Sequence, residues 1–419
     1  MQKLVRPSST IRGTVKAPAS KSMLQRAIAL ALLAETPVKI SNATSSNDAN
    51  AALGVIQALG ARVRIHKDEI FILGGLKPTG EILNCGEAGL GIRMFSPVAA
   101  LWHEELTLTG EGSLLKRPVT MVEPPLKQLG VTVTTTNGCP PLTVKGPLKG
   151  GRAQVDGSIS SQLLTGLLIA LPKAPGDSRL KVTHLKSTPY IDMTLAILKT
   201  FGVDIRHSGY ETFFIKGRQK YRFPRNEYRV EGDWSGAAFL LAAGAVGGTV
   251  LVTGLDTGSP QADRGIIAAL QAAGARVNMT KSTVEVTQNK LKAFSFDATH
   301  CPDLFPPLVA LACHCEGKTV LTGVERLIHK ESNRALALEQ EFSALGGEIR
   351  INGNQMEITG KTLRGGVLDS HNDHRMAMAG AVAAIHAEHE VTIRGYECIA
   401  KSYPHFFEDL RTLGAKVGE

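Results

Sequence analysis

The sequence is poor in aromatic residues and in long apolar runs. Phe, Trp and Tyr make up 5% of its 419 residues, so the core has to be built from Ala, Leu, Val and Ile. No stretch reaches the ~18 apolar residues of a membrane span, and no apolar run of signal-peptide length follows Met1. We therefore expect a cytoplasmic protein with no membrane partner.

Cysteine is scarce and scattered. Six cysteines occur at irregular spacing, and a chain of this size has no need of disulfide cross-links. Cys313-His314-Cys315 offers metal-ligating side chains, but no second ligand pair accompanies it and it follows an apolar run. We interpret this segment as the end of a buried helix and predict that the protein has no metal site.

Common nucleotide-binding motifs are also absent. The sequence contains no Walker A pattern, and Gly86–Gly91 lacks the dinucleotide-binding spacing. The net charge of +9 suits an anionic partner without identifying it. The densest basic stretch, which begins at Lys216, is not surrounded by a recognised binding module, so we expect no nucleic-acid partner.

What the sequence does contain is a long internal repeat. The recurring segment is an amphipathic helix end, a glycine and then a β-branched residue that starts a strand, as in Leu270–Val277. The six glycines stand 68 to 72 residues apart, at positions 60, 130, 202, 274, 346 and 414. Units of this length exceed a solenoid repeat and suffice for one small α/β unit each. We predict an α/β protein built from six such units.

The repeat also predicts the domain organisation. Three of the six glycines precede residue 229 and three follow it. We therefore place the first domain at 20–228 and the second at 229–419 completed by residues 1–19. Ligand clefts commonly lie between domains, so we expect the active site there.

Polar and basic residues gather where the predicted helices begin. Ser22 and Arg26 lie four residues apart at the start of an Ala/Leu-rich helix, and Lys330 and Arg334 have the same spacing in a segment that we predict to be helical. Free backbone amides and cations at helix N-termini bind phosphates and carboxylates. So many donors imply a ligand with several negative charges. The same kind of cluster occurs at Lys116–Pro118, Gly157–Gln162, Asn372–Arg375 and Lys401–Pro404.

At this point the motifs, in their order along nearly the whole chain, resemble those of the 5-enolpyruvylshikimate-3-phosphate synthases. The matching motifs are Lys21-Ser22 with Arg26, Gly89 with Arg93, Arg117-Pro118, Asp156–Gln162, Pro189-Tyr190, Glu231–Asp233, Pro302-Asp303, Lys330-Glu331 with Arg334, Asn372–Ala377 and Lys401–Pro404. The resemblance implies the enolpyruvyl transferase fold, in which two domains of three βαβαββ units direct helix N-termini into the cleft between them.

The resemblance implies a function as well. The enzyme would be a monomeric transferase of the shikimate pathway, serving chorismate and aromatic amino acid biosynthesis. It would move the enolpyruvyl group of phosphoenolpyruvate to the 5-hydroxyl of shikimate 3-phosphate and release phosphate through a tetrahedral intermediate. It would need no cofactor. In this family the herbicide glyphosate occupies the phosphoenolpyruvate site, so the chain would be a glyphosate target.

Site residues follow from the same resemblance. The implied ligands of shikimate 3-phosphate are Lys21, Ser22, Arg26, Ser160, Ser161, Gln162, Ser187, Asp303 and Lys330. The implied ligands of phosphoenolpyruvate are Lys21, Gly89, Arg117, Gln162, Arg334, Arg375 and Lys401. The implied catalytic residues are Asp303, Glu331, Lys21 and His374. Asp303 would deprotonate the attacking hydroxyl and Glu331 would protonate the methylene carbon, while cations hold the anionic substrates.

Two departures from the family pattern leave details open. Glu87 and Leu90 replace an Asn and a Thr beside Gly89, and Arg326 replaces an Asn that some members use on the shikimate phosphate. The nearest alternative function is the sister transferase that acts on UDP-N-acetylglucosamine. That enzyme carries a Cys five residues before the matching Arg, where this chain has Gly112. A non-catalytic anion-binding protein would leave Asp303 and Glu331 without a role.

Overall fold

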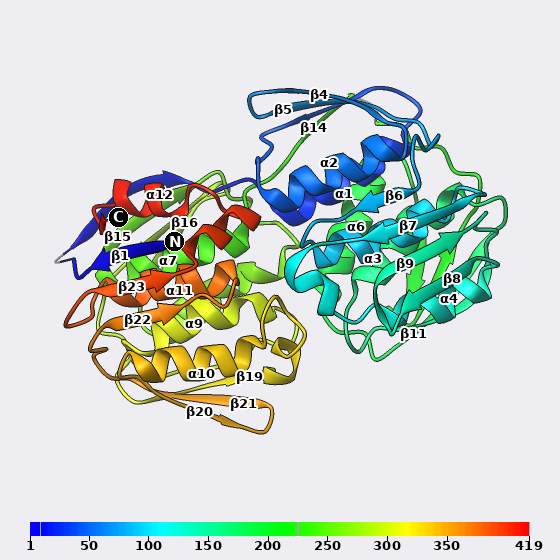
Figure 1. Cartoon of the computed structure of the whole chain (residues 1–419). Helices are drawn as coiled ribbons and strands as arrows, with labels where there is room; N and C mark the ends of the chain where they lie inside the picture. Colours follow the sequence, from blue (N-terminus) through cyan, green and yellow to red (C-terminus); the bar gives the residue numbers. More distant parts are fainter. Residues whose placement is uncertain (9, 224–225, 419) are drawn as a thin grey trace. The chain divides into compact units, whose positions relative to one another are not determined.

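Six four-stranded sheets share one topology in the computed structural model, which describes residues 1–8, 10–223 and 226–418 (Figure 1). In each sheet the first two strands are parallel, and the third and fourth follow antiparallel. Backbone contacts divide the chain into two units, Ala19–Val230 and Glu231–Glu419 with Met1–Pro18. The boundaries expected from the repeat differ from these by one and two residues.

The unit Ala19–Val230 contains three of the sheets. Their strands, in spatial order, are β14 (Glu227–Arg229), β3 (Val38–Ser41), β5 (Glu69–Leu73) and β4 (Arg62–His66); then β6 (Ile82–Asn84), β7 (Glu105–Thr109), β9 (Cys139–Lys145) and β8 (Thr132–Thr136); then β10 (Gly151–Asp156), β11 (Ser178–Thr183), β13 (Thr212–Ile215) and β12 (Ile205–Ser208). Its α-helices are α1 (Lys21–Leu33), α2 (Asn47–Ala58), α3 (Gly89–Ala99), α4 (Glu123–Gln128), α5 (Gln162–Ala170) and α6 (Thr188–Thr200).

The other unit repeats this plan. Its strands, in spatial order, are β2 (Ile11–Lys16), β15 (Gly248–Thr253), β17 (Thr283–Thr287) and β16 (Arg276–Met279); then β18 (Ser295–Asp297), β19 (Lys318–Thr322), β21 (Gln355–Thr359) and β20 (Glu348–Asn352); then β22 (Gly366–Asp369), β23 (Val391–Arg394), β1 (Gln2–Arg6) and β24 (Lys416–Gly418). Its α-helices are α7 (Trp234–Gly247), α8 (Ile266–Ala272), α9 (Phe305–Ala312), α10 (Arg334–Ala344), α11 (His374–Ala384) and α12 (Phe406–Thr412).

One helix per sheet forms the core of each unit. All residues of α9 and α11 are buried, and so is every residue of α7 except Ser235. These three helices pack against one another, and Figure 1 shows α10 lying against the hairpin of β20 and β21. A helix enclosed on all sides has to be apolar around its circumference, which explains the runs of Ala, Leu and Gly. The core is therefore aliphatic, as the low aromatic content predicts.

The six repeated glycines confirm the predicted helix ends. They follow α2, α4, α6, α8, α10 and α12, and their φ angles lie between +76° and +108°. Only glycine adopts this left-handed conformation without strain. Gly60 has an additional constraint, because a Cβ atom there would lie 2.4 Å from the carbonyl oxygen of Lys77.

One predicted helix start is wrong. The helix expected from Lys330 begins at Arg334 instead, because the side chain of Asn333 accepts a hydrogen bond from the backbone N–H of Leu336 and caps the first turn. Lys330 and Arg334 therefore do not share a helix face. Lys330 lies in the turn before α10.

Parallel strands bring the helix starts of a unit to common edges. In each pair of parallel strands the chain leaves both carboxyl ends on the same side and enters the following helix there, as β10 does before α5 and β11 before α6. Helix N-termini and the turns before them thus gather at the carboxyl edge of the sheet, which is where ligands commonly bind in α/β proteins.

Candidate active site

All of the predicted site residues in the described chain lie at these helix starts or in short turns that precede them. Lys21, Ser22 and Arg26 belong to α1, Gly89 begins α3, Gln162 begins α5, and Ser187 occupies the N-cap position of α6. Asp303 lies in the short 3₁₀ helix η5 (Pro302–Leu304), and His374 and Arg375 begin α11. Most of the remaining residues occupy turns: Arg117 after η1 (Gly112–Lys116), Ser160 and Ser161 before α5, and Lys330 and Glu331 before α10. Lys401 is the last residue of the 3₁₀ helix η7 (Tyr396–Lys401).

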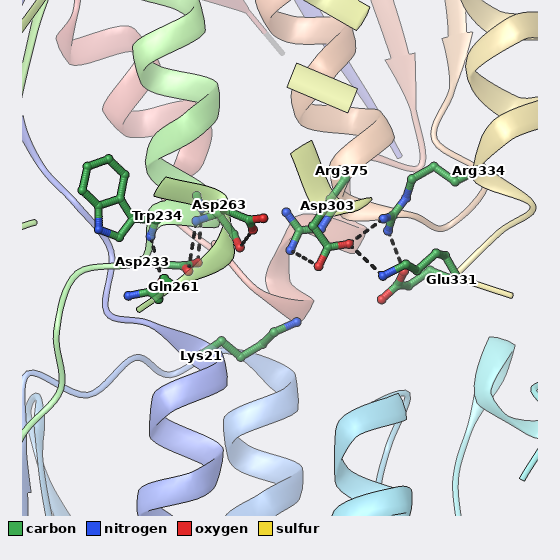
Figure 2. Close-up of polar contacts among 12 residues, drawn as sticks. Lys21, Asp233, Trp234, Gln261, Asp263, Asp303, Glu331, Arg334 and Arg375 are labelled. Carbon is green, nitrogen blue, oxygen red and sulfur yellow. Dashed lines mark hydrogen bonds and ion pairs between the residues drawn. The ribbon is translucent and has the colours of Figure 1, made fainter. Parts of the chain in front are cut away.

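Asp303 is the centre of a charged cluster within its unit. Its Oδ1 lies 3.1 Å from Nζ of Lys330 and 2.8 Å from Nη1 of Arg334, and its Oδ2 lies 3.2 Å from Nη2 of Arg375. Figure 2 shows Asp303 beside Arg334 and Arg375. Four residues from three separate parts of the sequence thus share one small region. The cations are partly or wholly buried, so solvent screens these contacts poorly.

The cations control the protonation of Asp303. Burial acts to raise the pKa of this carboxyl, but Arg375, Lys330 and Arg334 outweigh it and hold the pKa well below its usual range. Burial also lowers the pKa of Lys330, against the opposing pull of Asp303. The carboxyl of Asp303 is therefore ionised at neutral pH and can accept a proton from a substrate.

Arg334 joins Asp303 to two further carboxylates. Its Nη2 lies 2.6 Å from Oε2 of Glu331, and its Nε lies 2.8 Å from Oδ2 of Asp373 (Figure 2 shows the pair with Glu331). Arg334 and Asp373 are both fully buried. Removing either partner would leave an uncompensated buried charge, which typically costs ~3–5 kcal/mol. The position of Glu331 relative to Asp303 is thus fixed through one rigid guanidinium.

Asp373 also organises the start of α11. Its side chain accepts a hydrogen bond from the backbone N–H of Arg375, and the two residues before it have left-handed φ angles, +50° at His371 and +55° at Asn372. Nζ of Lys401 donates to the carbonyl oxygen of Asn372 over 2.7 Å. Non-glycine residues in this conformation are strained, and such strain clusters at functional sites. Lys401 thus supports the turn that presents Arg375 and the buried His374.

A further buried carboxyl, Asp263, lies in this unit. It belongs to the 3₁₀ helix η4 (Ala262–Gly265) and accepts a hydrogen bond from the hydroxyl of Ser235. Burial raises its pKa to about 7, Asp303 adds to that rise, and Arg375 opposes it. Nothing in the sequence distinguishes Asp263 from an exposed helix-capping aspartate, so sequence reasoning missed it.

In the unit Ala19–Val230, Lys21 has an acidic partner. Its Nζ lies 2.8 Å from Oδ2 of Asp48, which stands in the first turn of α2. The two residues come from consecutive helices of the same sheet. Asp48 was not predicted, and the only signal was an acidic residue after Ser46 at a helix start. The pair holds the Lys21 side chain in one direction.

Arg26 is almost fully buried and its guanidinium is held on several sides. It donates to the hydroxyls of Thr194 and Thr165 over 3.0 and 3.5 Å, and to the carbonyl oxygens of Ser22 and Tyr190 over 2.8 and 3.2 Å. Burial lowers the pKa of Arg26 to about 10. Arg26 therefore joins α1 to α6 and positions the backbone of Ser22, in addition to its predicted role as a ligand.

Gly89 and Arg117 meet at the start of α3. A Cβ atom at residue 89 would lie 2.5 Å from Nη1 and 2.7 Å from Cζ of Arg117. The missing side chain therefore leaves the space that the guanidinium fills. Arg117 is itself mostly buried.

The start of α5 is organised in a similar way. Nη1 of Arg93 donates to Oε1 of Gln162 over 2.7 Å, and Nη2 of Arg93 donates to the carbonyl oxygen of Pro118. The Ser160 hydroxyl accepts a hydrogen bond from the backbone N–H of Gln162. Arg93 thus links Gln162 to the segment of Arg117. The sequence motif contained Arg93, but no role could be given to it.

Ser187 stands at the start of α6 in a strained conformation. It is buried, and its φ of +58° and ψ of +45° place it in the left-handed region. A serine pays for this conformation only where the surroundings enforce it. The placement agrees with a residue that is presented to a ligand.

Neither a membrane span nor a metal centre is evident in the described residues. None of the described helices is long and apolar enough to cross a bilayer. Within the same residues, no group of three or more His, Cys, Asp or Glu side chains could hold a metal ion. The expected absence of a metal remains a prediction for experiment.

Comparisons with known proteins identify the family. The family model for EPSP synthase (3-phosphoshikimate 1-carboxyvinyltransferase) matches residues 5–410. The chain belongs to the EPSP synthase family. A 3-phosphoshikimate 1-carboxyvinyltransferase of Clostridium kluyveri is 38% identical over 416 residues, which cover 98% of this chain and 96% of the relative. The enzyme of that name from Aeropyrum pernix is 39% identical over 410 residues, covering 98% and 95%.

A solved structure supports the fold of this EPSP synthase family member. The EPSP synthase of Acinetobacter baumannii superposes with a TM-score of 0.84 at 26% identity, and the match covers 100% of both chains. The predicted enolpyruvyl transferase fold is therefore confirmed. The family is one of transferases that pass the enolpyruvyl group of phosphoenolpyruvate to shikimate 3-phosphate in the shikimate pathway, and the chain carries this activity.

Proposed function

We propose that this member of the EPSP synthase family works by addition and elimination, with Asp303 as base and Glu331 as acid. The 5-hydroxyl oxygen of shikimate 3-phosphate bonds to the central carbon of phosphoenolpyruvate while the methylene carbon gains a proton and becomes a methyl group. The tetrahedral intermediate then loses a methyl proton and expels phosphate. The observation that carries the proposal is the joining of Asp303, Glu331 and three cations in one cluster.

Asp303 accepts the hydroxyl proton. Its three cations lower its pKa strongly, so in that arrangement it is a weak base. The carboxylate and phosphate groups of the substrates compete for the same cations. As Lys330, Arg334 and Arg375 turn to the substrate anions, their hold on Asp303 weakens and its pKa rises toward the value that a general base needs.

Glu331 donates the proton to the methylene carbon. Its carboxyl contacts Nη2 of Arg334, whereas Asp303 contacts Nη1, so one guanidinium bridges the two carboxyls. The negative charge of bound phosphoenolpyruvate, the donor of the enolpyruvyl group, favours the protonated form of a neighbouring carboxyl. The negative charge of the bound substrate thus favours protonated Glu331, while the cations beside Asp303 favour its ionised form, and an acid–base pair requires such opposite protonation states.

The remaining predicted residues bind the two substrates. We assign the donor to Lys21, Gly89, Arg117, Gln162, Arg334, Arg375 and Lys401, and the acceptor to Lys21, Ser22, Arg26, Ser160, Ser161, Gln162, Ser187, Asp303 and Lys330. The contacts that support these assignments are those that orient the side chains: Asp48 on Lys21, Gly89 under Arg117, Arg93 on Gln162 and Asn372 on Lys401. Charge-assisted hydrogen bonds from such fixed cations suit phosphate and carboxylate groups.

Phosphate release tests the acceptor and the metal prediction together. Purified protein is incubated with phosphoenolpyruvate and either shikimate 3-phosphate or UDP-N-acetylglucosamine, each with and without a strong chelator. We expect phosphate only with shikimate 3-phosphate, at a rate that the chelator leaves unchanged. Release with the nucleotide sugar would favour the sister transferase. Chelator inhibition that one divalent ion reverses would refute metal-independent turnover.

The expected monomer and the expected cytoplasmic location remain part of this proposal. Each domain-sized unit has its own aliphatic core, so no partner chain is needed to bury it. Analytical ultracentrifugation at micromolar concentration should give one species near the 44.7 kDa of the chain. A sedimenting species of twice that mass would contradict the monomer.

A further inference from the structure

Two chain segments continue to pair beyond the ends of β6 and β7. These parallel strands end at the register pair Asn84 and Thr109. Past that point the backbone N–H of Cys85 donates to the carbonyl of Thr109, and the N–H of Glu111 donates to the carbonyl of Gly86 over 2.7 Å. The two segments therefore leave the sheet as a connected pair, one toward α3 and the other toward η1.

Glu87 makes the next connection in this series. Its Oε2 accepts hydrogen bonds from both the backbone N–H and the hydroxyl of Ser113, each over 3.0 Å. Ser113 is the second residue of η1, and Arg117 follows directly after that helix. The series ends where the guanidinium of Arg117 lies against Gly89.

Gly112 shows that this arrangement is closely fitted. Its φ is +50°, and a Cβ atom there would lie 2.5 Å from Oε2 of Glu87. The carboxylate of Glu87 therefore occupies the space that the glycine leaves. Both glycines of this region, Gly89 and Gly112, give room to a charged side chain from the opposite segment.

We infer that Glu87 is a positioning residue for the donor site: by holding Ser113 it fixes η1 and keeps the Arg117 guanidinium against Gly89. The inference rests on the proposed role of Arg117 in binding phosphoenolpyruvate. Glu87 is one of the two replacements beside Gly89 that depart from the family pattern. A negative charge near an anion site is unfavourable unless hydrogen bonds satisfy it. The backbone N–H and the hydroxyl of Ser113 supply two such hydrogen bonds to Glu87.

Variants that change KM for phosphoenolpyruvate but not KM for shikimate 3-phosphate test the inference. In Glu87→Ala, η1 loses its attachment and Arg117 its fixed direction, so we expect KM for phosphoenolpyruvate to rise about tenfold. We expect KM for shikimate 3-phosphate to change less than twofold. Glu87→Gln keeps an acceptor oxygen for the Ser113 N–H and should restore most of the donor affinity. Ser113→Ala, which removes the hydroxyl that donates a hydrogen bond to Glu87, should raise KM for phosphoenolpyruvate a few-fold.

Glu123→Ala is the matched control. Glu123 is another glutamate of this unit that accepts a hydroxyl hydrogen bond, from Thr135, but it lies on α4 outside this series. We expect its loss to leave KM for the donor within twofold. A comparable rise in both variants would assign the effect to general loosening of the unit and would overturn the inference.

A double-mutant cycle with Arg117→Ala shows whether Glu87 acts through Arg117. Coupled residues give non-additive effects. We expect Glu87→Ala to raise KM for the donor little further once Arg117 is gone. An equal factor in both backgrounds, or an unchanged KM in Glu87→Ala alone, overturns the inference while Arg117 keeps its role. If Arg117→Ala itself leaves KM for the donor unchanged, the proposed donor site fails, and the inference fails with it.

Discussion

The guanidinium of Arg117 fills the space that would hold a side chain at Gly89. A Cβ atom at residue 89 would lie 2.5 Å from Nη1 of Arg117, closer than any real van der Waals contact. A side chain at residue 89 would therefore displace the guanidinium, whereas the φ angle of Gly89 itself does not demand a glycine. The relation explains how one small residue can influence the position of a cation 28 residues further along the chain.

Gly89→Ala should therefore weaken donor binding by displacing Arg117. The overpacking cost is typically ~1–3 kcal/mol, so we expect KM for phosphoenolpyruvate to rise roughly tenfold. Glyphosate is longer than phosphoenolpyruvate and has less room to shift, so its inhibition constant should rise by a larger factor. Steady-state kinetics of both constants in one buffer measure this. Gly54→Ala is the control, since a Cβ atom there meets nothing within 4 Å. Equal factors for donor and inhibitor would show that residue 89 does not face the region where they differ.

Asp303→Asn should lose mainly turnover. The amide can still bind the acceptor hydroxyl but is a poor base, so we expect kcat to fall ~10²–10⁴-fold. KM for either substrate should change little, because the three cations remain and are less neutralised. Asp256→Asn, at an exposed turn, is the matched carboxyl-to-amide control and should keep wild-type turnover. Full activity in Asp303→Asn would give Asp303 a purely structural role.

Asp263→Asn should stabilise the protein at alkaline pH. The folded-state pKa of Asp263 is raised to about 7, so the carboxyl contributes most to stability below its unfolded pKa of about 3.9 and loses that contribution as pH rises toward 7. An amide resembles the protonated acid at every pH. We expect its free energy of unfolding at pH 8 to exceed that of the wild type by on the order of 1–3 kcal/mol, with a smaller difference at pH 5.

Urea unfolding at pH 5 and pH 8 measures the effect of Asp263→Asn. Asp204→Asn, whose side chain is largely exposed, is the control and should show no such pH-dependent gain. The stability difference between Asp263→Asn and the wild type could instead be the same at pH 8 and at pH 5. That result would mean that Asp263 is ionised in the folded state, with Arg375 outweighing burial.

The sequence predicted what depends on local chemistry. Each glycine that ends a repeated helix can be recognised from its neighbours in the sequence, because a left-handed residue after an apolar helix face is a local requirement. The start of α10 was misjudged by four residues, since the competing cap at Asn333 can be weighed only once the turn geometry is known. Residue roles came from the family motifs and not from periodicity.

Contacts between distant segments could not be predicted. Lys21 pairs with Asp48, 27 residues away, and Arg26 binds Thr194, 168 residues away. These partners depend on how strands are ordered in a sheet, which no local pattern specifies. The contact between Glu87 and Ser113 is of the same kind, so the partner of this departure from the family pattern became known only from the fold.

The most direct test of the account is the fate of a solvent deuteron. The protein is incubated with phosphoenolpyruvate and shikimate 3-phosphate in D₂O, and the product is examined by proton NMR and mass spectrometry. Addition of a deuteron to the methylene carbon and loss of any one of the methyl hydrogens predict deuterium in the vinyl group of the product, with one phosphate released per product. A product whose vinyl group carries only protium would contradict addition and elimination, and no product at all would contradict the assigned activity.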